Sequence, residues 1–139
     1  MSEHPKVRPL PSLREPDTRP FWEATRAHEL RYQRCAACSG VVFYPRAHCT
    51  HCLSRDLTWE TSGGVGTIYS FSVVRQTYHP FFRALAPYAV AWIDLHEGFR
   101  MMSNVVGVKD PAHELHIGQW VRVRWEDHEE LSIPLFEPV

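Results

Sequence analysis

The sequence predicts a mainly β protein that begins with one helix, and three observations point to this class. An apolar stripe at helical spacing follows Pro20, two Cys-x-x-Cys pairs come next, and several short alternating runs follow the cysteines. Five short strands within about 75 residues suit a small closed barrel such as an OB-fold. We therefore expect an N-terminal helix, a rubredoxin-like zinc ribbon and a small five-stranded OB-fold barrel, in that order.

Composition and charge narrow the class of protein. The 139 residues are 44% apolar and 12% aromatic, which is enough to build a core. Fifteen basic and sixteen acidic residues leave a formal charge of −1, which argues against a dedicated nucleic-acid binder. No run approaches the roughly 18–20 apolar residues of a membrane helix, and residues 1–20 lack the apolar centre of a secretory signal. We expect a soluble, cytoplasmic protein without membrane contact, and in that reducing compartment cysteines favour metal binding over disulfides.

Residues 1–19 are expected to form a flexible, proline-rich arm. Five of the eleven prolines lie in the first twenty residues, and few large apolar side chains are there to offset the entropy of ordering. A helix is expected over residues 20–34, because Pro20 suits the first helical position and Phe21 begins the apolar stripe, with Trp22 beside it. This stripe either packs on the domain itself, docks onto another chain or covers a ligand channel.

Residues 35–60 are expected to form the zinc ribbon, with Cys35, Cys38, Cys49 and Cys52 as ligands. Ten residues separate the two pairs. A gap of two residues within each pair turns both thiolates toward one point, and two such knuckles complete a tetrahedron with Zn–S bonds of about 2.3 Å. Four thiolates leave no open position, so the metal serves folding and cannot activate a water molecule.

Two alternatives use the same cysteines. Disulfides would form in an exported protein, and iron in a rubredoxin-like redox site would colour the protein red. Gly40 is expected to supply the permissive backbone of the first knuckle, while His48 and His51 are expected to be loop residues and not ligands. Three arginines near the cysteines are expected to offset part of the negative charge of the metal centre: Arg31, Arg34 and Arg46.

Residues 61–139 are expected to form the barrel. Tyr69 and Phe71 are expected to share one face of the first strand. Gly98 suits a tight hairpin, and the glycines between residues 63 and 66 suggest a flexible joint. The five strands are expected over residues 67–75, 88–95, 99–106, 121–125 and 131–136.

A set of ordered motifs extends over residues from about 20 to 139. It resembles a family of zinc-ribbon/OB-fold proteins long known as a domain of unknown function and associated with acyl-CoA enzymes. Many relatives carry a basic residue where this chain has Glu137, which weakens the case for a phosphate contact there. The motifs are the two cysteine pairs flanking Phe43-Tyr44-Pro45-Arg46, the strand Gly66–Phe71, Asp94-x-x-x-Gly98, Ile117-Gly118-x-x-Val121-x-Val123 and the terminal Ile133–Pro138.

The resemblance implies a non-catalytic accessory subunit. Proteins of this family look like partners of thiolase-superfamily enzymes, which include thiolases, acyltransferases and the retro-aldolases that cleave side chains from steroid-CoA thioesters. The small subunit stabilises the large one and helps to form its CoA or acyl channel, and a two-plus-two heterotetramer follows from the symmetry of such enzymes. Other relatives work beside hot-dog-fold enoyl-CoA hydratases, which is the alternative partner.

No catalytic constellation is found in the sequence, and the candidate binding residues are aromatic or basic. The segment Tyr78–Arg83 gathers aromatic side chains around a proline, so it packs either on the barrel or against a partner or acyl chain. Arg75 and Arg83 are candidates for CoA phosphates. The full set of candidate ligand or partner residues is Phe21, Trp22, Tyr44, Arg46, Arg75, Tyr78, His79, Phe81, Phe82 and Arg83.

A single-stranded nucleic-acid-binding OB module is the second functional alternative. Such a module stacks bases on aromatic side chains within a basic groove. The aromatic side chains are present, but the balanced net charge of this chain does not favour such a groove.

Overall fold

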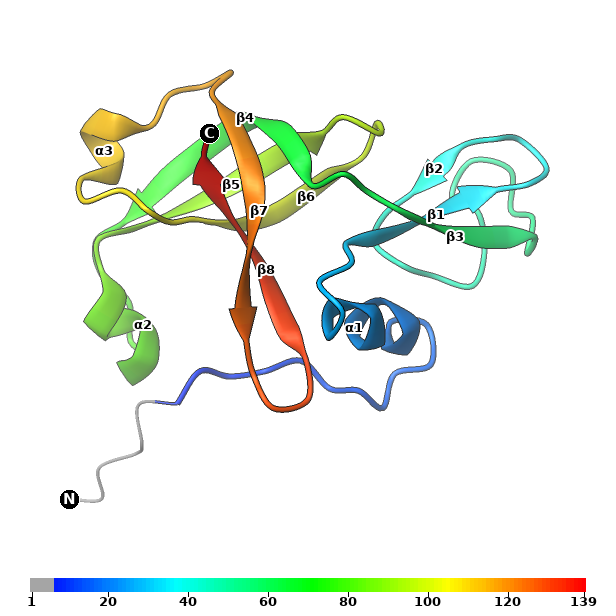
Figure 1. Ribbon diagram of the computed structural model, residues 1–139, viewed down its shortest axis with the longest axis horizontal. Coiled ribbons are helices and arrows are strands. Elements are labelled where there is room, and N and C mark those ends of the chain that lie inside the picture. Colours follow the sequence, from blue (N-terminus) through cyan, green and yellow to red (C-terminus); the bar gives the residue numbers. More distant parts are fainter. Residues whose placement is uncertain (1–6) are drawn as a thin grey trace.

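The computed structural model describes residues 7–139, in which a three-stranded ribbon lies beside a closed five-stranded barrel (Figure 1). The strand order is β2-β1-β3 in the ribbon and β4-β5-β6-β8-β7 in the barrel. Within residues 7–139, no helix is long and apolar enough to cross a membrane. The elements are α1 (Arg19–Thr25), β1 (Arg31–Cys35), β2 (Val41–Val42), β3 (Leu57–Thr61), β4 (Val65–Val74), α2 (Pro80–Leu85), β5 (Tyr88–Leu95), β6 (Arg100–Val105), α3 (Pro111–Glu114), β7 (Trp120–Asp127) and β8 (Ser132–Pro138).

The N-terminal helix is shorter than the predicted span of residues 20–34. Helix α1 ends at Thr25, whose buried hydroxyl donates a hydrogen bond to the Trp22 carbonyl (2.5 Å) and accepts one from the Ser132 backbone N–H (3.0 Å). The chain then turns through His28 at a positive φ of 58°. Residues 31–35 instead form β1, which pairs with β2 on one side and along its whole length with β3. This non-local pairing outweighs the helical spacing, which is a local signal.

The described part of the proline-rich arm lies along the barrel. Residues 7–18 contain no helix or strand and lead past the lower end of the barrel to α1 (Figure 1). Arg8 anchors this stretch, since its side chain is nine-tenths buried. Residues 1–6 of the predicted arm lie outside the described residues, and the mobility of the arm stays a prediction.

The five barrel strands lie where the sequence predicts them, but one side chain lies on the opposite face of its strand from the predicted one. In β4 the register shifts between Ile68 and Ser70, so Tyr69 is an extra residue in the pairing with β5. Such a bulge rotates the strand by one position. Tyr69 is therefore half exposed while Ile68 is buried in the core, and the prediction that Tyr69 shares the face of Phe71 is wrong.

The barrel closes weakly between β6 and β8. These strands pair only at Val105 and Phe136. Pro134 of β8 has no backbone N–H, so it cannot continue the ladder. Its carbonyl accepts a hydrogen bond from the Ser103 hydroxyl (2.7 Å), and the Met102 backbone N–H donates to the Tyr44 hydroxyl (3.0 Å). Side-chain hydroxyls thus replace strand pairing here, and an open seam remains between the two strands.

One hydrophobic core joins the ribbon to the barrel, and Phe99 contacts aromatic side chains of the ribbon within it. The Phe43 ring stacks on the Phe99 ring with centroids 4.7 Å apart, and the Tyr32 ring lies 5.1 Å from Phe99 on another side. Phe21 of α1 packs on Phe43 at 5.7 Å. The ribbon is too small for a core of its own, so this aromatic cluster fixes its position on the barrel.

The predicted joint at residues 63–66 is fixed to the barrel by a carboxylate. Glu97, in the turn between β5 and β6, accepts hydrogen bonds from the Ser62 hydroxyl (2.6 Å) and the Gly63 backbone N–H (2.8 Å). Burial raises the pKa of Glu97, but the hydrogen bonds from Ser62 and Gly63 outweigh it and hold the pKa below its ordinary value.

Because the pKa of Glu97 is lowered in the folded state, the ionised carboxylate stabilises the fold above the unfolded pKa of about 4.3. This contribution is lost as the pH falls through the folded pKa. We expect Glu97→Gln to lower the free energy of unfolding by about 1 kcal/mol at neutral pH, because this side chain is only partly buried. Urea unfolding at several pH values is the measurement: the gap between wild type and variant should shrink between about pH 5 and pH 3. A gap that does not change with pH would contradict this role of Glu97.

Candidate metal centre and adjoining hollows

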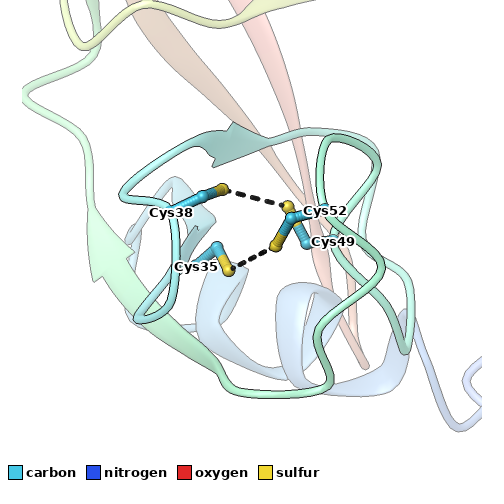
Figure 2. Close-up of side chains that lie close together, drawn as sticks. All are labelled: Cys35, Cys38, Cys49 and Cys52. Carbon is cyan, nitrogen blue, oxygen red and sulfur yellow. Dashed lines mark hydrogen bonds between the residues drawn. The ribbon is translucent and has the colours of Figure 1, made fainter.

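The four cysteine sulfurs converge on one point (Figure 2). Cys35 Sγ lies 3.6 Å from Cys52 Sγ, and Cys38 Sγ lies 3.6 Å from Cys49 Sγ. All four sulfurs are within 4.8 Å of one another. A regular tetrahedron with Zn–S bonds of about 2.3 Å has edges of about 3.8 Å, so the sulfurs fit a zinc ion. They are too far apart for disulfides, which need about 2.05 Å.

Two equivalent turns build the centre, one around each cysteine pair. Cys35 N–H donates to the Gly40 carbonyl (2.9 Å), and Cys49 N–H donates to the Ser54 carbonyl (2.8 Å). In each turn the residue after the second cysteine has a positive φ, which is 63° at Ser39 and 67° at Leu53. The backbone thus folds both pairs in the same way.

Gly40 has a different role from the predicted one. The positive φ that the knuckle needs is adopted by Ser39, and Gly40 instead provides space. A Cβ atom at Gly40 would lie 2.6 Å from His51 Cδ2 and 3.2 Å from Cys38 Sγ. His51 thus lies against the outside of the cluster, where Nε2 is 3.3 Å from the Val41 carbonyl oxygen.

The electrostatics of the sulfurs favour a bound cation. The Cys38 backbone N–H, assisted by that of Ala37, lowers the pKa of the Cys35 thiol to about 6. The Ser54 backbone N–H lowers the pKa of Cys52, but contacts with the other three sulfurs and burial raise it to about 12. Opposite shifts in pKa are expected for neighbouring thiols, because four thiolates so close together repel each other. A divalent metal removes this repulsion, which fits the donor set to zinc.

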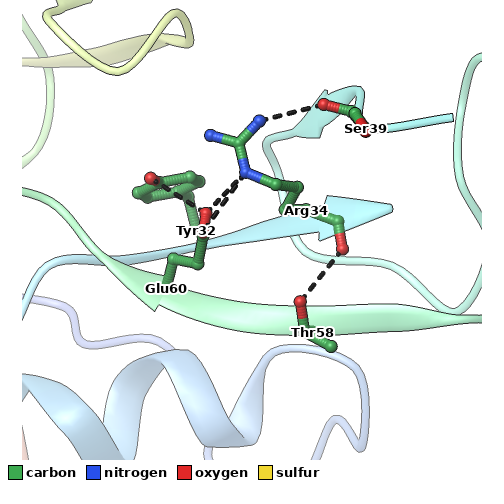
Figure 3. A network of polar contacts seen from close by, with 5 residues as sticks. All are labelled: Tyr32, Arg34, Ser39, Thr58 and Glu60. Carbon is green, nitrogen blue, oxygen red and sulfur yellow. Dashed lines mark hydrogen bonds and ion pairs between the residues drawn. The ribbon is translucent and has the colours of Figure 1, made fainter. Parts of the chain in front are cut away.

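The arginines near the cysteines mainly pair with carboxylates. Arg31 Nη2 lies 2.8 Å from Glu29 Oε2, and Arg34 Nε lies 2.6 Å from Glu60 Oε1. Arg34 also donates to the Ser39 carbonyl (2.9 Å), so the ion pair is tied to the first knuckle (Figure 3). Neither Arg31 nor Arg34 is therefore an unpaired positive charge for the metal centre.

A buried glutamine holds the loop between the two knuckles. Gln33 Nε2 donates to the Arg46 carbonyl and Gln33 Oε1 accepts from the Arg46 N–H, both at 3.0 Å. The side chain of Arg46 donates to the Tyr44 carbonyl (3.1 Å). Gln33 could not be singled out from the sequence, because nothing in a strand of mixed polarity marks the one polar side chain that is buried.

The predicted ligand or partner residues fall into two separate groups. Phe21, Trp22 and Tyr44 line a hollow of about 340 Å³ at the seam between β6 and β8. Phe82 lines a second hollow of about 230 Å³ beneath α2. Arg46 lies beside the first group on the ribbon, and its side chain is exposed.

The remaining candidates are on or near α2. Tyr78 is 86% exposed, and His79 caps α2 by accepting a hydrogen bond from the Phe81 N–H (3.1 Å). Arg83 donates to the carbonyls of Thr77 (3.3 Å) and Tyr78 (2.9 Å), so its guanidinium group stabilises the start of the helix. Arg75 is exposed beyond the end of β4.

Arg8 is a site residue that the sequence did not reveal. It lines both hollows and lies at the point where they adjoin, although it belongs to a proline-rich arm without periodicity. The sequence did contain a signal for the seam between β6 and β8. Pro134 within a predicted strand indicates a broken ladder, and the first hollow lies at that break.

Comparison with known proteins gives two adjacent family matches. Residues 22–58 match the model described as ChsH2, rubredoxin-like zinc ribbon domain, and residues 59–126 match that of ChsH2, C-terminal OB-fold domain. A solved chain described as "Ltp2-ChsH2(DUF35) aldolase" is 35% identical, with a TM-score of 0.80, and the match covers 94% of this chain and 98% of that one.

Two curated relatives are longer than this chain. A probable enoyl-CoA hydratase alpha subunit of Thermomonospora curvata is 38% identical over 136 residues, which are 95% of this chain and 40% of the relative. A 3-oxo-4,17-pregnadiene-20-carboxyl-CoA hydratase alpha subunit of Mycobacterium tuberculosis is 34% identical over 123 residues, which are 88% of this chain and 38% of the relative. The chain thus spans about two fifths of the length of these relatives.

Proposed function

Because this chain belongs to the ChsH2/DUF35 family of zinc-ribbon/OB-fold proteins, we propose that it is a non-catalytic accessory subunit that binds and stabilises an acyl-CoA enzyme. The partner is a thiolase-superfamily enzyme, in particular a retro-aldolase that cleaves the side chain of a steroid-CoA or related thioester. The subunit helps to form the CoA or acyl channel of that partner.

One comparison supports an aldolase partner more strongly than a hydratase partner. The solved relative that this chain matches over 98% of its length belongs to a structure described as an aldolase of Ltp2 and ChsH2. The hydratase subunits are more than twice as long as the matched region, so their hydratase activity need not lie in the part that this chain shares. The aldolase partner is therefore the better supported of the two.

The metal centre supports a scaffold role. Four converging sulfurs saturate a zinc ion, so the zinc offers no position for water or substrate. Catalytic zinc sites keep one position open. The ribbon then contributes folding free energy and shape to the subunit, and the chemistry belongs to the partner.

The exposed aromatic surface supports partner binding. Trp92 and Met102 are directly paired on neighbouring strands and are 37% and 48% exposed. Tyr69 directly precedes Ser70, the β4 partner of Trp92, and the Tyr44 hydroxyl accepts a hydrogen bond from the Met102 N–H. Tyr69 and Tyr44 are 50% and 44% exposed. Tyrosine, tryptophan and methionine are enriched where protein interfaces are buried, so this face of the barrel is suited to a protein partner.

The charges of the strands do not support the nucleic-acid alternative. Within residues 7–139, arginines on the ribbon and barrel strands are paired with carboxylates, including Arg100 with Asp94 (2.6 Å) and Arg122 with Glu137 (3.1 Å). Binding of single strands uses a basic groove that follows the phosphate backbone. Paired arginines form no such groove.

Co-expression tests the proposal directly. The chain is expected to co-purify with a thiolase-like or aldolase-like partner protein, and to raise that protein's thermal stability and activity. A hot-dog-fold hydratase subunit, co-expressed in parallel, is the comparison. The proposal fails if the aldolase-like protein is fully stable and active alone and does not co-purify, and co-purification with the hydratase alone would favour the alternative partner.

A further inference from the structure

The two hollows beside the barrel are parts of one groove. The first lies between β6, β8, α1 and the ribbon, and the second lies between β6, β7 and α2. Arg8, Asn104 and Leu135 line both of them, so the hollows adjoin at these three residues. Their volumes of about 340 and 230 Å³ together lie within the range of about 300–1,000 Å³ that is usual for ligand sites.

The larger hollow is suited to an apolar chain. It exists because β6 and β8 separate at Pro134, and its walls are formed mainly by aromatic, methionine and aliphatic side chains such as Trp22, Met101 and Ile133. The hydroxyls that bridge the seam already bond to backbone groups, Ser103 to the Pro134 carbonyl and Tyr44 to the Met102 N–H. Few polar groups in this hollow are thus left for a polar ligand.

Arg8 is the polar exception. Its side chain is only 10% exposed, and its guanidinium carbon lies 5.4 Å and 5.5 Å from the ring centres of Phe81 and Phe82. Arg8 Nε is 2.7 Å from Glu126 Oε2, but the two groups are not aligned as a hydrogen bond. The buried Nε–H donor is therefore unsatisfied within residues 7–139.

A buried hydrogen-bond donor without an acceptor lowers the stability of the fold, unless a ligand accepts its hydrogen bond. Arg8 offers such a donor where the two hollows meet. Its charge is already partly offset by Glu126, which also contacts His128 Nε2 at 2.7 Å. A free carboxylate would be repelled by Glu126, whereas a neutral carbonyl oxygen would accept a hydrogen bond without adding charge.

We propose that this groove binds an acyl thioester, with the acyl chain in the larger hollow, the carbonyl oxygen on the Arg8 guanidinium and the thioester end directed to the hollow beneath α2. The choice of a thioester rests on the proposed function, and the geometry of Arg8 and the hollows supplies the site. Arg8 is a binding residue contributed by the N-terminal arm, outside the two domains that the family models match.

Methionine methyl NMR of the full, zinc-loaded chain tests this site, because two of the three methionines, Met101 and Met102, line the larger hollow. Decanoyl-CoA is the probe, with decanoate and CoA alone as comparisons. Saturable shifts of both methyl signals are expected with decanoyl-CoA, weaker binding with decanoate and no shift with CoA. Arg8→Leu should weaken decanoyl-CoA binding by about tenfold or more, the usual effect of losing a hydrogen bond to a charged group.

Arg14→Leu is the matched control, since it removes an exposed arginine of the same arm, and it should change affinity by no more than about twofold. Unshifted Met101 and Met102 signals, equal affinity in Arg8→Leu, or decanoate binding as tightly as decanoyl-CoA would each overturn the inference. The two proposals fail separately. If the chain binds decanoyl-CoA but no enzyme partner, the proposed site is upheld and the accessory role is contradicted. If the chain binds an enzyme partner but not decanoyl-CoA, the accessory role is upheld and the proposed site is contradicted.

Discussion

Cys38→Ser is expected to release the zinc and unfold the ribbon. A neutral serine hydroxyl is a poor substitute for a thiolate, and structural zinc supplies about 10–16 kcal/mol of apparent binding free energy in small zinc modules. The ribbon has no core of its own beyond Cys35, Val42 and Cys49, with Leu57 packed against them. Metal analysis after gel filtration and backbone NMR of β1–β3 are the measurements, and the activity of the bound partner should fall with them.

His48→Ala is the matched control for this prediction. His48 lies in the same loop, but its side chain accepts a hydrogen bond only from Arg55 Nε (3.0 Å) within the described residues. The variant should keep one zinc per chain and a folded ribbon. If Cys38→Ser kept a full complement of zinc and the fold, the assignment of the four ligands would be wrong.

Gly66→Ala is expected to destabilise the barrel by about 3 kcal/mol, at the upper end of overpacking penalties. Gly66 pairs with Leu95 of β5 on one side and with Val121 of β7 on the other, so it lies between two neighbouring strands. A Cβ atom there would overlap the backbone carbonyl oxygen of Asp94 and lie 3.1 Å from Ile93 Cγ2. Because the obstacle is backbone, the strands must separate to make room.

Urea unfolding measures this effect, with Gly63→Ala as its control. The nearest atom to a Cβ at Gly63 is Glu97 Oε2 at 3.7 Å, an ordinary contact. The control should change the free energy of unfolding by less than about 0.5 kcal/mol. Equal effects in the two variants would contradict the close approach of β4 and β5 at Gly66.

The parts of the fold that the sequence predicted correctly are those with local signals. Alternation marked the barrel strands, and Gly98, with a φ of 101°, marked the β5–β6 hairpin. The two Cys-x-x-Cys pairs identified the metal centre, because the spacing of the ligands within a knuckle is itself a local geometric constraint.

The errors arose where distant residues decide the structure. Strand β1 looked helical until its pairing with β3 was known, and Tyr69 looked inward until the bulge was seen. Helix α2 was not among the predicted elements, because it is short and has no buried residue to give its sequence an apolar periodicity. Arg8 could not be found, because its burial depends on α2 and β7, which lie far along the chain.

X-ray absorption at the zinc edge of the purified chain tests the central claim most directly. A saturated centre predicts four sulfur ligands at about 2.3 Å and no lighter neighbour. A nitrogen or oxygen ligand at about 2.0–2.2 Å in place of a sulfur would mean that a histidine or water completes the site. In that case the zinc would not be held by four thiolates, and a purely architectural metal centre would be contradicted.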